Sequence, residues 1–184
     1  MMISSFGDGE IRTDASMEGI EAADLSIREK IRKARSLYRD YKAILLEHPQ
    51  IRDLLERLDR SLETSREVMF RGGVVAACRW CEEEAGGSCC GAGIENRYTI
   101  HLLLMNLLLG VSLPDRRAWT DSCYFLGEAG CCLQARHVLC VNYLCEKLRR
   151  DLDPGVLQDL QQSSGTELDT GFVLHEALKK ITGA

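Results

Sequence analysis

Nine cysteines, all between residues 78 and 145, constrain this 184-residue chain more than any other feature of its sequence. They form two dense groups separated by a 32-residue gap. The first group is Cys78-x2-Cys81-x7-Cys89-Cys90. The second group is Cys123-x7-Cys131-Cys132-x7-Cys140-x4-Cys145. Filling an apolar core does not require C-x2-C pairs or adjacent cysteines, so the pattern predicts a shared chemical role for the thiols.

The N-terminal residues and the longest apolar run of the chain indicate the cellular compartment in which we expect the protein. Residues 1–10 lack the basic and apolar regions of a secretory signal. The longest apolar run, residues 100–111, is interrupted by His101 and Asn106. It is shorter than the roughly 20 residues that a membrane-spanning helix needs. We therefore expect no membrane partner and a location in the bacterial cytoplasm, where cysteines stay reduced and point to metal or redox chemistry rather than disulfides.

Composition narrows the fold and the partners further. The formal net charge of −5 argues against nucleic acid as the main partner. Hydrophobic residues make up 45% of the chain, enough for a packed core, while three prolines and 6% aromatic residues favour helices over sheets. The predicted fold class is all-α, with no strand hairpin.

The first part of the chain, residues 1–70, contains no cysteine and predicts an antiparallel helical hairpin. Two apolar stripes at helical spacing lie on either side of Pro49. The first stripe is Ile27, Ile31, Ala34, Tyr38, Tyr41 and Leu45. The second is Ile51, Leu55, Leu58, Leu62 and Met69, with Ser65 as its polar member. Folding at residue 48 would place Leu45 against Ile51 and Ile27 against Met69, and the hairpin could also dock a protein partner.

The rest of the chain divides into a cysteine-cluster region, residues 71–150, and C-terminal helices, residues 151–184, that pack on the same core. Within the cysteine region we expect a buried helix at residues 100–111, a loop-rich stretch at 113–130 and a helix at 136–150. Asp153 followed by Pro154 is typical of a helix start, because aspartate caps and proline suits the first helical position. An amphipathic helix is expected at residues 167–181.

Thiolates are soft ligands that favour zinc, copper(I) or iron–sulfur clusters over magnesium or calcium. Four cysteines can surround one zinc ion tetrahedrally, and four cysteines also hold common iron–sulfur clusters. The spacing alone does not separate these cofactors. The sequence offers no phosphate-binding loop, nucleophile elbow, HExxH or dinucleotide fingerprint, so no catalytic residue is assigned.

The second cysteine group, with Arg136 within it, resembles the second half of the YkgJ-type family of zinc- or iron-chelating domains. The first group resembles that family's opening cysteine pair and adjacent cysteines. Two features depart from the family pattern: seven residues separate Cys81 from Cys89, and His137 stands where proline is usual. The resemblance selects as metal ligands Cys78, Cys81, Cys89, Cys90, Cys123, Cys131, Cys140 and Cys145. Cys132 is not selected. The resemblance implies zinc or iron as the metal. Iron is implied further because similar proteins, such as a flagellin lysine methylase, are associated with an iron–sulfur cluster.

Three functions follow as hypotheses. The first is a metal-binding protein whose zinc or iron centre staples the helices around residues 100–111. The second is an iron–sulfur redox enzyme or accessory protein, and the third is a helical adaptor with a structural zinc site. For His101 we favour a hydrogen-bonded core residue over a ligand, whereas His137 is an outside candidate for a ligand or a donor to one.

Overall fold

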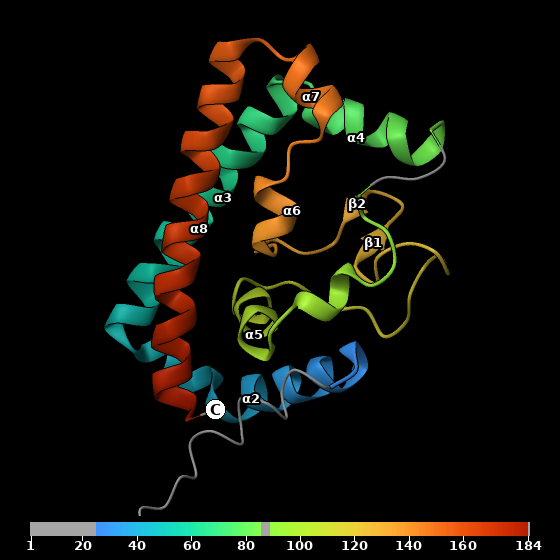
Figure 1. Ribbon diagram of the computed structural model, residues 1–184. Helices are drawn as coiled ribbons and strands as arrows, with labels where there is room; N and C mark the ends of the chain where they lie inside the picture. Colours follow the sequence, from blue (N-terminus) through green and yellow to red (C-terminus); the bar gives the residue numbers. More distant parts are fainter. Residues whose placement is uncertain (1–24, 86–88, 184) are drawn as a thin grey trace, which may run out of the picture.

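Two long helices begin the described part of the chain. The computed structural model describes residues 25–85 and 89–183. Helix α2 (Ile27–Glu47) starts at a capping box in which the Ser26 hydroxyl accepts from the Glu29 N–H and the Glu29 carboxylate accepts from the Ser26 N–H. Helix α3 (Pro49–Arg71) follows after one residue, with proline at its first position. The molecule is mainly helical (Figure 1).

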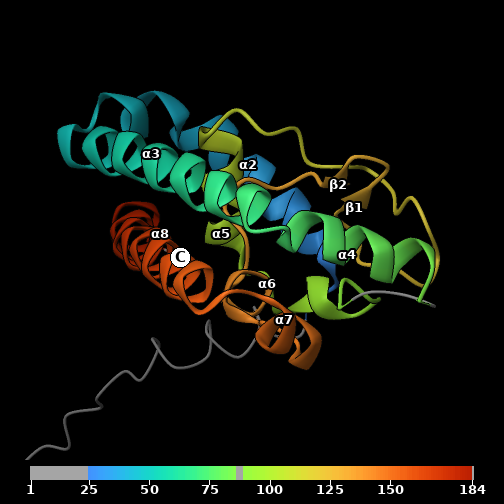
Figure 2. The ribbon, with the colours of Figure 1, turned by 90° about the horizontal axis from the view of Figure 1, so that it is seen from above.

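The two helices separate instead of pairing along their whole length. α2 lies mainly against α5 (Ile100–Leu108), and α3 runs beside α8 (Pro154–Thr182) in both views (Figures 1 and 2). Near the turn, Leu45 and Ile51 pack in one cluster as the stripes predict. At the far ends, however, Ile27 and Met69 belong to different clusters. The predicted register is therefore wrong at these ends. The apolar stripe of α2 packs mainly against α5, and that of α3 packs mainly against α8.

Helix α8 is a single helix of 29 residues where the sequence suggested two. Asp153 caps it, since its carboxylate accepts a 2.8 Å hydrogen bond from the Gly155 N–H. Gly171 lies where α8 meets α5 and α3: a Cβ there would be in ordinary contact with Met105 Cε at 3.8 Å and Leu58 Cδ1 at 3.9 Å. α8 therefore packs closely against both α3 and α5.

Shorter elements fill the side of the molecule opposite the α3–α8 pair (Figure 1). They are α4 (Val74–Glu83), η1 (Ile94–Arg97), β1 (Leu126–Gly127), β2 (Gly130–Cys131), α6 (Val138–Asn142) and α7 (Glu146–Asp151). β1 and β2 form an antiparallel hairpin, so the prediction of no strand hairpin was wrong here. Its turn needs a left-handed residue, and Gly130 supplies one with φ of 98°.

Helix α5 is buried as expected but is shorter than the apolar run that predicted it. It ends at Leu108, and the chain turns at Gly110 with φ of 83°. Across the described ranges, no helix combines the length and the apolar character needed to cross a membrane. Residues 1–10, where we looked for a secretory signal, lie outside the described residues.

Asn106 ties α5 to the chain that leads into the second cysteine group. Its side chain is fully buried. The amide nitrogen donates to the carbonyls of Leu102 at 2.9 Å and Ala135 at 2.8 Å. The amide oxygen accepts from the N–H groups of Gln134 at 2.8 Å and Ala135 at 3.1 Å. All four hydrogen-bonding positions of the amide are thus used.

Replacing Asn106 with alanine should therefore lower the free energy of unfolding by about 2–4 kcal/mol, because buried backbone groups lose their partners. Urea denaturation at pH 7 measures this change. Asn96→Ala, at an exposed position, is the matched control and should change stability by less than about 0.5 kcal/mol. A change of that small size in Asn106→Ala would show that the amide does not hold this region.

His101 is a core residue, as we favoured, and it lies on the α8 side of α5. Its Nε2 atom is 3.0 Å from the Thr182 hydroxyl, and its ring packs edge-on against His175 with centroids 5.5 Å apart. The residue is 6% exposed. Burial, together with the neighbouring His175, lowers the pKa of His101 to about 4.

The lowered pKa predicts an acid-dependent loss of stability. Unfolded His101 binds a proton near pH 6.5, while the folded residue stays neutral until about pH 4. The free energy of unfolding therefore falls by at most about 3 kcal/mol as the pH falls from 6.5 to 4, because protons bind the unfolded state more tightly. His101→Gln should lose this component, so its unfolding free energy should fall less over that range than that of the wild type. His48→Gln, at the α2–α3 junction, is the control, and equal pH slopes for all three proteins would contradict the assignment.

Candidate metal centre

The eight predicted ligands lie in short segments outside the α3–α8 pair. Two lie one turn apart on α4, two follow the undescribed residues 86–88, one precedes β1, and one each lies in β2, in α6 and at the N-cap of α7. In that order they are Cys78 and Cys81, Cys89 and Cys90, Cys123, Cys131, Cys140, and Cys145. None of the nine cysteines, all of which the structure describes, forms a disulfide.

Backbone pairing joins the two cysteine groups. The Cys123 N–H donates a 2.6 Å hydrogen bond to the Cys90 carbonyl, and the Ala92 N–H donates to the Asp121 carbonyl at 3.0 Å. Gly91 and Ser122 form an antiparallel bridge between these bonds. The 32-residue gap in the sequence is thereby closed, and Cys90 is placed beside the second group.

A buried ion pair supports this junction. Glu95, 2% exposed, pairs with Arg117, which also donates to the Ser122 carbonyl. The second carboxylate oxygen of Glu95 accepts from the Gly93 N–H at 2.8 Å. A buried carboxylate is stable only when its oxygens are compensated, and here both are. The pair therefore holds residues 93–95 against the chain just before Cys123.

Tyr98 connects the junction to α6. Its hydroxyl accepts from the His137 N–H at 3.1 Å and lies 3.8 Å from Cys140 Sγ, to which it donates. Its ring packs on Phe125 with centroids 4.9 Å apart. Burial, reinforced by Cys140 and Cys131, raises the pKa of Tyr98, so the phenol stays protonated. His137 itself is the N-cap of α6, and burial lowers its pKa.

The thiols influence one another across these segments, and Cys90 is the neighbour that most of them share. Burial raises the pKa of Cys78, Cys131 and Cys140, and Cys90 raises each of them further. A hydrogen bond with Cys90 is the largest cause of the raised pKa of Cys89. Thiols from α4, from the 89–90 segment, from β2 and from α6 therefore lie within electrostatic reach of one sulfur.

The remaining predicted ligands belong to the same neighbourhood. Cys145 and Cys81 both contribute to the raised pKa of Cys78. Burial raises the pKa of Cys123 to about 12, with contributions from Glu95 and from Cys131. Burial raises the pKa of Cys131 to about 11. A raised pKa favours the neutral thiol at Cys78, Cys89, Cys123, Cys131 and Cys140, although the side chains of Cys78, Cys89 and Cys131 reach the surface. Conversion of these thiols to thiolates would need a compensating positive charge.

The thiols are neighbours but do not yet surround a common point. Within the described ranges, no group of three or more His, Cys, Asp or Glu side chains is close enough to hold a metal ion. Their chemistry fits zinc or iron, since the set is made of soft donors from segments that converge. Cys132 is exposed and influences its neighbour Cys131. His101 faces Thr182 and α8 instead of joining this set.

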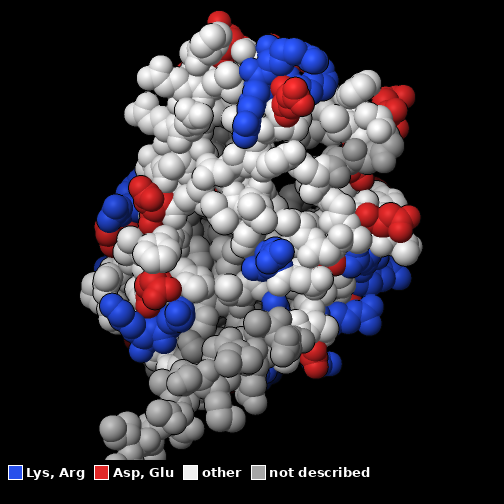
Figure 3. Space-filling model, viewed as in Figure 1, with Lys and Arg blue, Asp and Glu red and all other residues white. Residues whose placement is uncertain are grey.

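Uncharged surface lies next to the cluster. Figure 3 shows Lys and Arg in small groups interspersed with Asp and Glu on this face, with uncharged areas between them. Trp80 on α4 and Val138, Leu139 and Tyr143 around Cys140 are between 45% and 55% exposed. Lys147 lies over the Trp80 ring, 5.7 Å from its centroid. Apolar side chains around a metal site restrict water access, which raises the strength of the electrostatic interactions within it.

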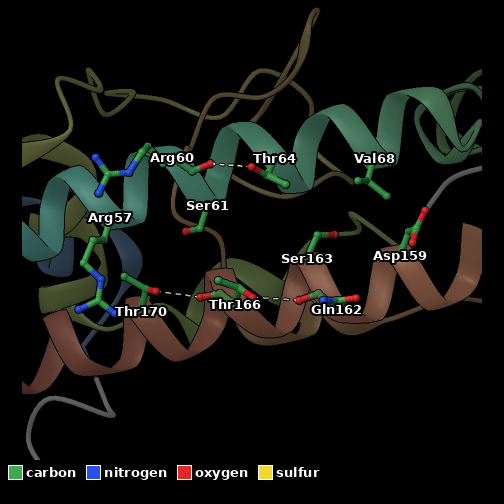
Figure 4. Close-up of a pocket in the computed structure, with 10 residues that line it drawn as sticks. All are labelled: Arg57, Arg60, Ser61, Thr64, Val68, Asp159, Gln162, Ser163, Thr166 and Thr170. Atoms are coloured by element: carbon green, nitrogen blue, oxygen red, sulfur yellow. Dashed lines mark hydrogen bonds between the residues drawn. The ribbon is translucent and has the colours of Figure 1, made fainter.

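A groove of about 480 Å³ lies between α3 and α8, away from the cysteines (Figure 4). Hydroxyl groups from both helices line it, and most bond to a carbonyl one turn earlier in their own helix: Thr64 to Arg60, Thr166 to Gln162 and Thr170 to Thr166. Charged and amide side chains also line the groove, but none of its lining residues is a cysteine. We therefore place the candidate chemistry at the cysteines and not in this groove.

The structure also identifies supporting residues that the sequence did not single out. Tyr98, Glu95 and Asn106 hold the two cysteine groups in place. The role of Asn106 could have been suspected from the sequence, because a polar residue within a buried apolar helix needs hydrogen-bond partners. The partners of Glu95 and Tyr98 are 22 and 39 residues away, and no periodicity marks them.

Comparisons of the chain with protein-family models, with curated proteins and with solved structures found no match. The resemblance to the YkgJ-type family therefore stays a prediction from the cysteine pattern.

Proposed function

We propose that this chain is a cysteine-ligated metal-binding protein, and that the metal is zinc or an iron centre held by the eight cysteines. One observation carries the proposal. Chain pairing places Cys90 beside Cys123, so that thiols far apart in the sequence share one partly desolvated neighbourhood. Core cysteines have no reason to gather in this way, whereas metal ligands must.

The raised pKa values of the thiols reflect the free-energy cost of forming thiolates, which a bound metal would offset. Burial and mutual repulsion disfavour thiolates at Cys78, Cys123, Cys131 and Cys140. A bound cation would neutralise much of this repulsion and supply free energy of folding. Because the thiols do not already surround one point, we propose that binding draws the α4 and 89–90 segments toward β2 and α6. The proposal places the chain in a reducing compartment such as the cytoplasm.

The test is the metal content of protein purified without oxygen, measured together with acid-labile sulfide and a visible absorption spectrum. We expect about one or two metal ions per chain, because eight thiolates can form two four-cysteine sites. Colourless protein with zinc would indicate a structural site, and a brown chromophore with matching iron and sulfide would indicate a cluster.

Two matched variants make the measurement specific to the cluster. Cys90→Ser should lower the metal content by half or more, since Cys90 is the thiol shared by the most neighbours. Cys132→Ser, which changes the one cysteine outside the proposed ligand set, should retain the metal content of the wild type. Undamaged anaerobic wild-type protein without either metal would refute the proposed function.

A further inference from the structure

A threonine, a histidine and a glutamate are joined by hydrogen bonds where α5 meets the C-terminal half of α8. The Thr99 hydroxyl oxygen lies 2.9 Å from Nε2 of His175. Nδ1 of the same ring lies 3.1 Å from a carboxylate oxygen of Glu176. A hydroxyl within hydrogen-bond reach of a base, with a third group that orients the base, is the arrangement that covalent catalysis by a hydroxyl requires. We call these three residues the threonine triad.

The carboxylate of Glu176 determines where the protons of the triad lie. A carboxylate oxygen can only accept a hydrogen bond, so we assign the ring proton of His175 to Nδ1 and a free lone pair to Nε2. The Thr99 hydroxyl therefore donates to Nε2, which is the direction in which a base removes a proton. The hydrogen bond with His175 lowers the pKa of Glu176, and Lys179 at 3.5 Å lowers it further, so the carboxylate stays ionised.

Helix α5 holds both the hydroxyl and the imidazole in position. The His175 ring packs edge-on against the buried His101 ring, which is itself anchored by the Thr182 hydroxyl at 3.0 Å. Thr99 is the N-cap of α5, and its side-chain oxygen accepts a 3.1 Å hydrogen bond from the Leu102 N–H. The proton of the hydroxyl thus remains available to His175, and the donated N–H stabilises negative charge that develops on the oxygen.

The triad is open to solvent, unlike a hydrogen bond that only fills the core. Thr99 is exposed, and the side chains of His175 and Glu176 are 22% and 40% exposed. Phe172, one turn before His175 on α8, is 68% exposed. The accessible hydroxyl and this exposed aromatic ring favour a small ester with an apolar acyl group as the substrate.

We propose that the threonine triad is a second, metal-independent site that hydrolyses carboxylic esters, with Thr99 as the nucleophile, His175 as the general base and Glu176 as a positioning residue. The Thr99 oxygen bonds to the ester carbonyl carbon while its proton passes to Nε2 of His175. The tetrahedral oxyanion then expels the alkoxide, which takes this proton and leaves as the alcohol. Water attacks the acyl-threonine, His175 accepts a proton from it, and this proton returns to the Thr99 oxygen as the acid leaves. One ester and one water molecule thus give one acid and one alcohol.

The experiment measures steady-state hydrolysis of 4-nitrophenyl butyrate by the full-length chain, after the initial burst in which cysteine thiols also take up acyl groups. A fluorophosphonate probe, mapped by mass spectrometry, identifies the activated hydroxyl, which we expect to be Thr99. Thr99→Asn keeps a good helix cap but has no nucleophile, and His175→Gln has no base. Each should lower kcat by about 100-fold or more, whereas Thr99→Ser should stay within about 10-fold of the wild type.

Further variants separate the positioning role of Glu176 from a general effect of charge or of hydroxyl groups. Glu176→Gln should lower kcat by about 10-fold or more and leave KM within about 2-fold, because the amide no longer fixes the ring proton on Nδ1. Glu63→Gln and Thr64→Ala change exposed residues of α3 and should alter kcat by less than about 2-fold. If Thr99→Asn or His175→Gln does not fold, the residue labelled in the wild type and the kcat of Glu176→Gln decide the question.

Three outcomes would overturn the inference. The wild type could show no turnover after the burst, or the probe could label residues other than Thr99. Alternatively, Thr99→Asn could keep the kcat of the wild type, which would show that the triad only ties α5 to α8. The metal content of the chain affects none of these results, so the inference and the proposed metal-binding function stand or fall separately.

Discussion

The arrangement of the cysteine region depends on the buried amide of Asn106. Its four hydrogen bonds fix residues 134 and 135 against α5, and this fixes the chain on both sides of them. Cys131 lies just before this point, and Arg136 and Cys140 follow it. An apolar side chain could fill the same space, but burial is non-directional and would tolerate more than one register. Hydrogen bonds are directional, so the amide selects a single position for the segment.

The second constraint is the closure between residues 90–92 and 121–123. It brings together cysteines that are separated by a 32-residue gap, and closing a loop costs conformational entropy. The Glu95–Arg117 pair and the Tyr98 hydroxyl offset this cost from within the loop and from α6. The cysteine neighbourhood is therefore assembled by ordinary packing and hydrogen bonding before any metal is considered. A metal would refine the positions of thiols that the chain has already gathered.

The sequence predicted the helices better than their partners. The stripes on either side of Pro49 and the Asp153 cap are local signals, and α2, α3 and the start of α8 match them. Which stripes meet is decided by total burial, and α3 packs more extensively against α8 than against α2. The candidate ligands could be recognised from the spacing of the cysteines. Tyr98 and Glu95 could not, because their hydrogen-bond partners are distant in the sequence and no pattern marks them. The burial of Glu167 could have been predicted, because it shares the helical spacing of Leu160, Leu174 and Leu178 on the buried side of α8.

The two buried carboxylates differ in how their burial is compensated. Glu95 is paired with Arg117 and accepts from a backbone N–H, so it can stay charged and hold the junction just before Cys123. Glu167 has no ion pair among the described residues, and burial raises its pKa, which favours the protonated carboxyl. A neutral carboxyl costs less to bury than an unpaired carboxylate. Glu95 therefore acts as a charged support of the cysteine junction, whereas Glu167 is a buried polar group of α8.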